Sequence, residues 1–180
     1  MKSSRNNRAL TRAALCLAIA AAAQALRLLL PLPPIASMLL IGTVVNLCLC
    51  FAVWGSGIVY AGVICLLLPL FAFMQGHLPL LPMVAVVFFG NLVLCLVVQQ
   101  QKRWKHYVFA PLLKAVTLWS CTGIVCNLFR IPQQAKSMLQ ISMGIPQWTT
   151  ALLGVAAAAF LWKRLEKSGI LRMEKSIDKQ

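Results

Sequence analysis

The sequence predicts an all-α integral membrane protein with six transmembrane helices and both termini in the cytoplasm. Three observations lead to this fold class. Hydrophobic residues make up 61% of the chain, the mean hydropathy is +0.83, and the apolar residues fall into six stretches. A helix needs about 20 apolar residues to cross a ~30 Å hydrocarbon layer, and the third and sixth stretches are on the short side. The six predicted spans are residues 9–30, 35–54, 57–73, 78–98, 108–128 and 148–162.

Basic residues give the predicted orientation, because Lys and Arg near span ends are retained on the cytoplasmic side. Thirteen of the 17 basic residues lie before the first span or in its first turn, between the fourth and fifth spans, or after the sixth. Arg27, Arg130 and Lys136 fall on the other face. We therefore expect a cytoplasmic segment at residues 1–8, a six-helix membrane domain at 9–165 and a basic cytoplasmic tail at 166–180. Cations that flank spans meet anionic lipid headgroups, so the formal charge of +14 does not indicate a nucleic-acid partner.

The first span carries alanines at helical spacing. Ala14 and Ala18 form a small-xxx-small pair, which lets a second helix approach the backbone closely. The basic start of the chain and the triplet Ala23-Gln24-Ala25 also resemble a signal peptide with its cleavage site. Because apolar residues resume at Leu26 and complete a full-length span, we expect an uncleaved helix. Cleavage would leave five spans and an outside N-terminus.

The second and fourth spans each carry one amide side chain at a similar depth. Asn46 and Asn91 lie about 17–20 Å below the outer surface at 1.5 Å per residue, so they can share one layer. Two interpretations stay open: an interhelical hydrogen bond, or contact with a ligand. Gly42 and Gly90 beside them indicate close helix approach.

The fifth span contains Lys114, the only charge deep in a predicted span. An intramembrane cation is a functional candidate by default. Lys114 lies about 9 Å above the cytoplasmic end of its helix, so we expect its stem to snorkel to that interface or to contact a partner subunit, rather than to bind substrate.

Polar and aromatic residues gather toward the predicted outer face. They occur in the third-to-fourth loop, along the fifth span and at the start of the sixth. The connection at 131–146 also has apolar residues at helical spacing, as in a short amphipathic lid. We expect this outer group as a whole to take part in binding a small molecule.

Residue types and motifs that the sequence lacks argue against several classes of function. The three acids, Glu166, Glu174 and Asp178, all follow the last span, so the carboxylates of ion-coupled transporters and of Mg²⁺ sites are lacking. The sequence has no P-loop for nucleotide phosphates. The seven cysteines fall inside spans and form no C-x-x-C pair, which favours a packing role over metal or disulfide chemistry. We therefore expect no enzyme activity, no metal and no cofactor.

Taken in order, the motifs of residues 10–165 resemble the substrate-binding S-component family of energy-coupling factor (ECF) vitamin transporters. The resemblance rests on the Ala14/Ala18 pair, Gly42-x-x-x-Asn46, Pro69-x-x-Ala72 leading to Gly76-x-x-Pro79, Gly90-Asn91, Lys114, and Pro146-Gln147-x-x-Thr150-Ala151-Leu152-x-Gly154.

The resemblance implies a high-affinity binder in a bacterial cell membrane that transports only with partners. Those partners are a transmembrane coupling subunit, which docks at Ala14 and Ala18, and two ATPase subunits. The resemblance also places the substrate near the outer face, and by position it points to Gln75, His77, Asn91, Trp119, Asn127, Gln147 and Trp148 as the binding residues. The outer group offers amides and indole rings but no acid, so we expect a neutral or anionic heterocycle of vitamin size as substrate. A scaffold or assembly protein without transport activity is the alternative, and it would show no tight binding of a small molecule.

Overall fold

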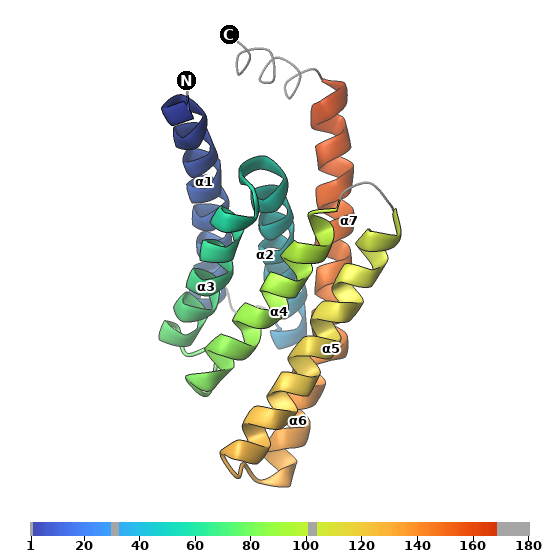
Figure 1. Cartoon of the computed structure of the whole chain (residues 1–180). Coiled ribbons are helices and arrows are strands. Elements are labelled where there is room, and N and C mark those ends of the chain that lie inside the picture. Colours follow the sequence, from blue (N-terminus) through green and yellow to red (C-terminus); the bar gives the residue numbers. More distant parts are fainter. Residues whose placement is uncertain (1, 30–32, 101–103, 169–180) are drawn as a thin grey trace.

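The computed structural model describes residues 2–29, 33–100 and 104–168, which form seven helices and no strand. The helices are α1 (Lys2–Leu29), α2 (Pro34–Ser56), α3 (Ile58–Met74), α4 (Pro82–Val98), α5 (Trp104–Leu128), α6 (Gln133–Met143) and α7 (Ile145–Lys167). The start of α1 and the end of α7 lie at the same end of the molecule (Figure 1). The all-helical fold class is therefore confirmed.

Four helical segments are long and apolar enough to cross a bilayer, by length and composition. They are Asn6–Leu29, Ile35–Ser56, Lys105–Leu128 and Gln133–Lys167, of which the last joins α6 to α7. The helices α3 and α4 are also apolar but have 17 residues each. Such a helix is about 25 Å long at 1.5 Å per residue. Each of the six predicted spans contains one helix. That all six cross the membrane stays a prediction.

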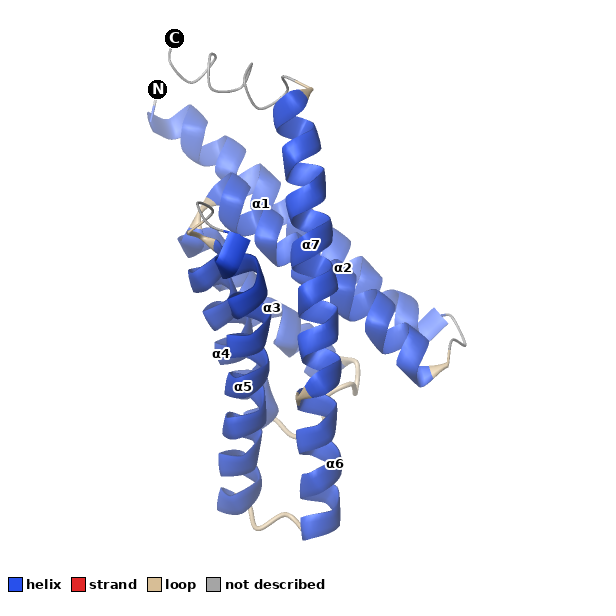
Figure 2. Cartoon of the chain, turned by 90° about the vertical axis from the view of Figure 1, so that its right-hand side faces the viewer, coloured by secondary structure: helices blue, strands red, loops and turns tan. Residues whose placement is uncertain are grey.

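The connection predicted at residues 131–146 contains the helix α6. It begins after Pro132 and ends before Gly144. It packs against α5 and continues the line of α7 (Figure 2). The apolar residues there do lie at helical spacing, and Met138 and Ile141 are exposed. Its closure as a lid stays a prediction.

Prolines and glycines mark the helix ends. Prolines occupy the first turns of α2, α4 and α7. Backbone N–H groups in a first turn have no acceptor within the helix, so the missing N–H of proline breaks no hydrogen bond there. Gly57 separates α2 from α3 with φ at 94°, a conformation that glycine adopts without steric cost. Arg12 of α1 donates from Nη1 to the Gly55 carbonyl oxygen at 3.0 Å, which places a cation at the negative end of α2.

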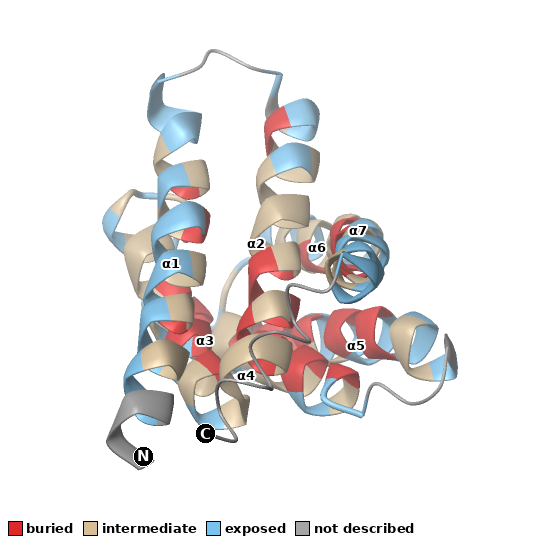
Figure 3. Cartoon of the chain, turned by 90° about the horizontal axis from the view of Figure 1, so that it is seen from above, coloured by how far each residue is buried: buried red, intermediate tan, exposed pale blue. Residues whose placement is uncertain are grey.

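The larger hydrophobic core lies where α2, α3, α4 and α7 meet. Its fully buried members include Leu49, Ile64, Leu94 and Val155, and buried residues face inward when the bundle is seen from its end (Figure 3). Many large apolar side chains lie on the outside instead, such as Val59 at 75% exposed. An apolar exterior around a packed interior is what a lipid environment requires.

Aromatic rings gather at the end of the molecule where α1 begins and α7 ends. Trp54 of α2 lies 5.5 Å from the Trp162 ring of α7 and 6.0 Å from the Tyr107 ring of α5, between ring centroids. Its indole N–H donates to the Val98 carbonyl oxygen at 3.0 Å. Amphipathic rings of this kind are common at membrane interfaces. The opposite end, formed by residues 74–81 and 129–132, is called the outer end below.

The predicted domain limits compare with the helices as follows. The segment 1–8 is continuous with the first span from Lys2 on, because α1 begins there. The predicted tail overlaps the end of α7 at Glu166 and Lys167. The remainder of the tail, 169–180, lies outside the described residues.

Candidate functional site

A buried polar network joins three helices at the centre of the bundle. Lys114 of α5 donates from Nζ to Asn46 Oδ1 of α2 at 2.6 Å and to Asn91 Oδ1 of α4 at 2.8 Å. The three side chains are 2%, 1% and 3% exposed, respectively. The expectation that the two amides share one layer is therefore confirmed. The expectation that Lys114 snorkels is wrong, because its ammonium is satisfied inside the protein.

Glycines let the helices around this network come close. A Cβ on Gly154 of α7 would lie 2.6 Å from Asn46 Cβ, and one on Gly42 of α2 would lie 2.8 Å from Thr150 Cγ2. A Cβ on Gly90 of α4 would meet Leu118 Cδ2 at 2.6 Å. The close approach predicted from Gly42 and Gly90 is thus confirmed. The glycines bring α7 close to α2, which carries Asn46, and α5 close to α4, which carries Asn91.

Both polar atoms of the Asn46 amide form hydrogen bonds within the protein. Its Nδ2 donates to the Gly42 carbonyl oxygen at 2.7 Å, while its Oδ1 accepts from Lys114. Of the two interpretations of Asn46, the interhelical hydrogen bond is the one the structure contains. Asn91 contacts the same ammonium through Oδ1.

The end of α3 shapes the loop that carries Gln75 and His77. Gly76 has φ at 74°, and its N–H donates to the Phe73 oxygen at 2.9 Å. The His77 N–H donates to the Ala72 oxygen at 2.9 Å. These two bonds form a Schellman cap, which requires a left-handed residue at the position that Gly76 occupies. The cap sets the direction in which the chain leaves α3.

Gln75 and His77 differ in their surroundings. The amide oxygen Oε1 of Gln75 is buried and has no hydrogen-bond partner within the described part of the chain. Buried acceptors are normally satisfied, so an orphaned one in a loop indicates a partner from outside the chain. Partial burial, followed by the positive charge of Arg27, lowers the pKa of His77 below its usual 6.5. His77 is therefore more readily neutral than a free histidine.

The predicted residues of α5 lie beside α6. Asn127 Oδ1 accepts from Lys136 Nζ at 2.7 Å, and the Trp119 carbonyl oxygen accepts from Gln140 Nε2 at 3.5 Å. The Trp119 side chain is 53% exposed. Arg130 follows with φ at 52°, an uncommon value for a residue other than glycine. The turn after α5 and the first turn of α6 thus hold one cation each, Arg130 and Lys136, at the outer end.

The first turn of α7 carries the other two candidates. Gln147 is half-buried and its carbonyl oxygen accepts from Thr150 Oγ1 at 3.1 Å. Trp148 is 38% exposed. Across the described residues, no hydrogen bond joins any two of the seven predicted binding residues. The structure places Asn91 in the core with Lys114, and the other six in the loop after α3, along α5 and at the start of α7.

Ala14 and Ala18 lie on the exposed face of α1 with Leu15 and Ile19. The opposite face of α1 packs into the protein through Ala13, Ala20 and Gln24, which are all buried. Gln24 is a buried polar residue that was not among the candidates predicted from the sequence. Its Nε2 donates to the Leu68 oxygen at 3.3 Å, whereas its Oε1 has no partner. A single amide among apolar residues was the signal that could have identified it.

Thr122 of α5 was also passed over. It is 0% exposed, and its hydroxyl oxygen has no hydrogen-bond partner. It lies eight residues after Lys114, and that spacing places both side chains on one face of the helix. Counting helical turns from Lys114, the one charged residue of this span, would have identified Thr122.

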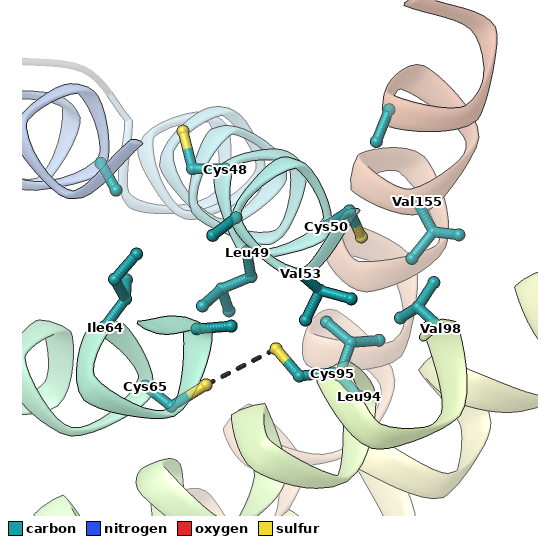
Figure 4. Packing of buried hydrophobic residues seen from close by; sticks show 14 of the residues in the cluster. Cys48, Leu49, Cys50, Val53, Ile64, Cys65, Leu94, Cys95, Val98 and Val155 are labelled. Atoms are coloured by element: carbon teal, nitrogen blue, oxygen red, sulfur yellow. Dashed lines mark hydrogen bonds between the residues drawn. The ribbon is translucent and has the colours of Figure 1, made fainter. Parts of the chain in front are cut away.

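All seven cysteines are free, and five of them are buried. Cys65 of α3 and Cys95 of α4 lie 3.6 Å apart, measured between sulfur atoms (Figure 4). Both belong to the larger hydrophobic core, together with Cys48 and Cys50. Among the described residues, no group of three or more His, Cys, Asp or Glu side chains is arranged to hold a metal ion.

Comparison with protein-family models, curated protein sequences and solved structures finds no match to this chain.

Proposed function

We propose that the protein is the substrate-binding S-component of an ATP-driven ECF-type importer in a bacterial cell membrane, for a vitamin or a related small molecule. The observation that carries the proposal is the division of α1 into two faces. One face packs on α2 and α3, and the other exposes Ala14 and Ala18 between large apolar side chains. Small residues on a lipid-exposed face allow a helix of another protein to pack closely.

The outer end supports the substrate-binding part of the proposal. Gln75 offers a buried acceptor without a partner, and Arg27, Arg130 and Lys136 give this end three cations. The described residues include one acid, Glu166, which lies at the other end of the bundle, near the end of α7. This charge distribution favours neutral or anionic substrates over cationic ones, because a buried cation would lack a counter-ion.

The energy for transport comes from other proteins in this proposal. The sequence has no nucleotide-binding loop and no acid before Glu166, so neither ATP hydrolysis nor a carboxylate proton carrier is available within the bundle. A transmembrane coupling subunit and two ATPase subunits would supply the work. The exposed face of α1 is the surface on which the coupling subunit would dock.

Ligand binding to the isolated protein is the direct test. The protein is purified in detergent, any co-purified small molecule is identified by mass spectrometry, and its affinity is measured by calorimetry. Gln147→Ala should weaken binding by roughly ten- to a hundredfold, since a hydrogen bond in a desolvated site contributes about 1–3 kcal/mol.

Gln100→Ala serves as the matched control, because the same truncation is then made in an exposed residue at the opposite end of the bundle. Its affinity should equal that of the wild type. Absence of any bound or binding small molecule would contradict the proposal and favour a scaffold protein. Equal losses in both variants would show that the substrate does not bind at the outer end.

A further inference from the structure

Lys114 carries a charge that the protein does not neutralise. Its ammonium contacts two amide oxygens, which are dipoles without net charge. The first acid in the sequence is Glu166, and it lies in the last turn of α7, beyond the aromatic cluster. The described part of the bundle therefore holds a buried cation and no carboxylate in its interior.

A packing role does not account for this residue. Burying an ammonium loses its hydration, and neutral acceptors return only part of that free energy. A methionine of similar length would fill the same space between α2, α4 and α5 without this cost. Ionisable residues inside membrane helices are usually retained for a function. The missing component of the network is an anion.

The ammonium has one N–H donor without an acceptor among the described residues. A lysine ammonium has three N–H donors, and two of them are used by Asn46 and Asn91. We propose that Lys114 is the anion-recognition group of the substrate site, and that the substrate is a heterocycle bearing a carboxylate or a phosphate. This inference rests on the proposed function, and it narrows the substrate class to acids.

One face of α5 leads from the outer end to Lys114. Leu118 lies one turn above Lys114, fully buried against Gly90, and Thr122 lies one turn above Leu118. The Thr122 hydroxyl is buried without a partner, so it offers a donor and an acceptor to the uncharged part of a substrate. Entry requires Leu118 to leave the surface of Gly90, and a change of side-chain rotamer is a fast motion.

Matched pairs of compounds test the inference on the purified protein. The probes are nicotinate with nicotinamide, biotin with biotin amide, and riboflavin 5′-phosphate with riboflavin. Each is tested by thermal shift and calorimetry on wild type and on Lys114→Met. We expect the acid of at least one pair to bind wild type, and its neutral partner to bind about a hundredfold more weakly. Lys114→Met should lose that preference, because it removes the ammonium and keeps a side chain of similar length.

Asn91→Asp is the second variant, because it keeps the shape of the side chain and supplies an internal counter-ion. Its carboxylate should pair with Lys114, so the affinity for the acid probe should fall more than the affinity for its neutral partner. Asn46→Asp is unsuitable, since the Asn46 amide also donates to the Gly42 carbonyl oxygen. A purely structural Lys114 predicts that Asn91→Asp binds both probes with wild-type affinity.

The outcomes separate the inference from the proposed function. Equal affinity of wild type for the two members of the pair that binds would overturn the inference and leave substrate binding intact. Acid binding that survives in Lys114→Met would do the same. If none of these compounds binds wild type and no small molecule co-purifies with it, both the inference and the proposed function are wrong.

Discussion

At the scale of single residues, burial separates two kinds of polar side chain in this protein. Lys114, Asn46 and Asn91 satisfy one another inside the bundle. Gln75 and Thr122 are buried with an oxygen that has no partner. Residues of the first kind fix helices relative to one another, and the Lys114 ammonium keeps one N–H donor for a ligand. The oxygens of the second kind remain able to accept a hydrogen bond from a ligand.

His77 makes stability depend on pH. Burial and the charge of Arg27 lower its pKa below 6.5 in the folded state, so the unfolded chain binds more protons as the pH falls through that window. The thermal midpoint should therefore drop as the pH is lowered from about 7 through the unfolded pKa of about 6.5. His77→Gln should remove this part of the drop.

Thermal melts of the detergent-solubilised protein across this pH range measure the effect. Arg27→Gln should reduce the drop without abolishing it, because burial, the larger cause, remains. Identical pH profiles for wild type and His77→Gln would contradict the prediction.

At the scale of helices, contact between α2 and α7 depends on glycine at one position. A Cβ on Gly154 would meet Asn46 Cβ at 2.6 Å and the Thr43 carbonyl oxygen at 2.8 Å, and a backbone atom cannot move aside as a flexible side chain does. Gly154→Ala should therefore destabilise the protein by about 1–3 kcal/mol. It should also disturb the Lys114 network, of which Asn46 is a member.

Gly62→Ala is the matched control, since nothing lies within 4 Å of a Cβ at that helical position. It should leave stability unchanged or raise it by up to about 1 kcal/mol, because alanine is the better helix former. Unfolding in detergent, followed by circular dichroism, compares the two variants. Equal stability of both variants would show that α2 and α7 are not in close contact.

The exposed face of α1 should be needed for transport and not for binding. Ala14→Trp and Ala18→Trp place bulk on that face, and close packing with a second helix then becomes impossible. Uptake by cells that also produce the coupling subunit and the ATPases should be abolished, while calorimetry on the isolated variants shows wild-type affinity. Val59→Trp, on the exposed side of α3, should retain uptake. Uptake by both α1 variants would contradict docking at this face.

At the scale of the whole molecule, hydropathy predicted where the helices lie, because it is a local property of the chain. Each predicted span contains a helix. The surroundings of Lys114 were mispredicted, since they depend on α2 and α4 packing beside α5. Spacing along one helix reports the distance to an interface and not which side chains from other helices surround a residue.

The arrangement of the two ends predicts the orientation in a membrane. The loop after α3 and the turn after α5 lie at the outer end, whereas Gln100, the start of α1 and the end of α7 lie at the other (Figure 1). Since most basic residues lie at the second end, that end should be cytoplasmic.

Labelling of single cysteines tests this orientation. The native cysteines, five of which are buried, are best replaced by alanine. Single cysteines at Met74 and Gln134 should then react with an impermeant thiol reagent on intact cells. Cysteines at Gln100 and Ser168 should react only after the membrane is opened, and labelling of Gln100 on intact cells would overturn the topology.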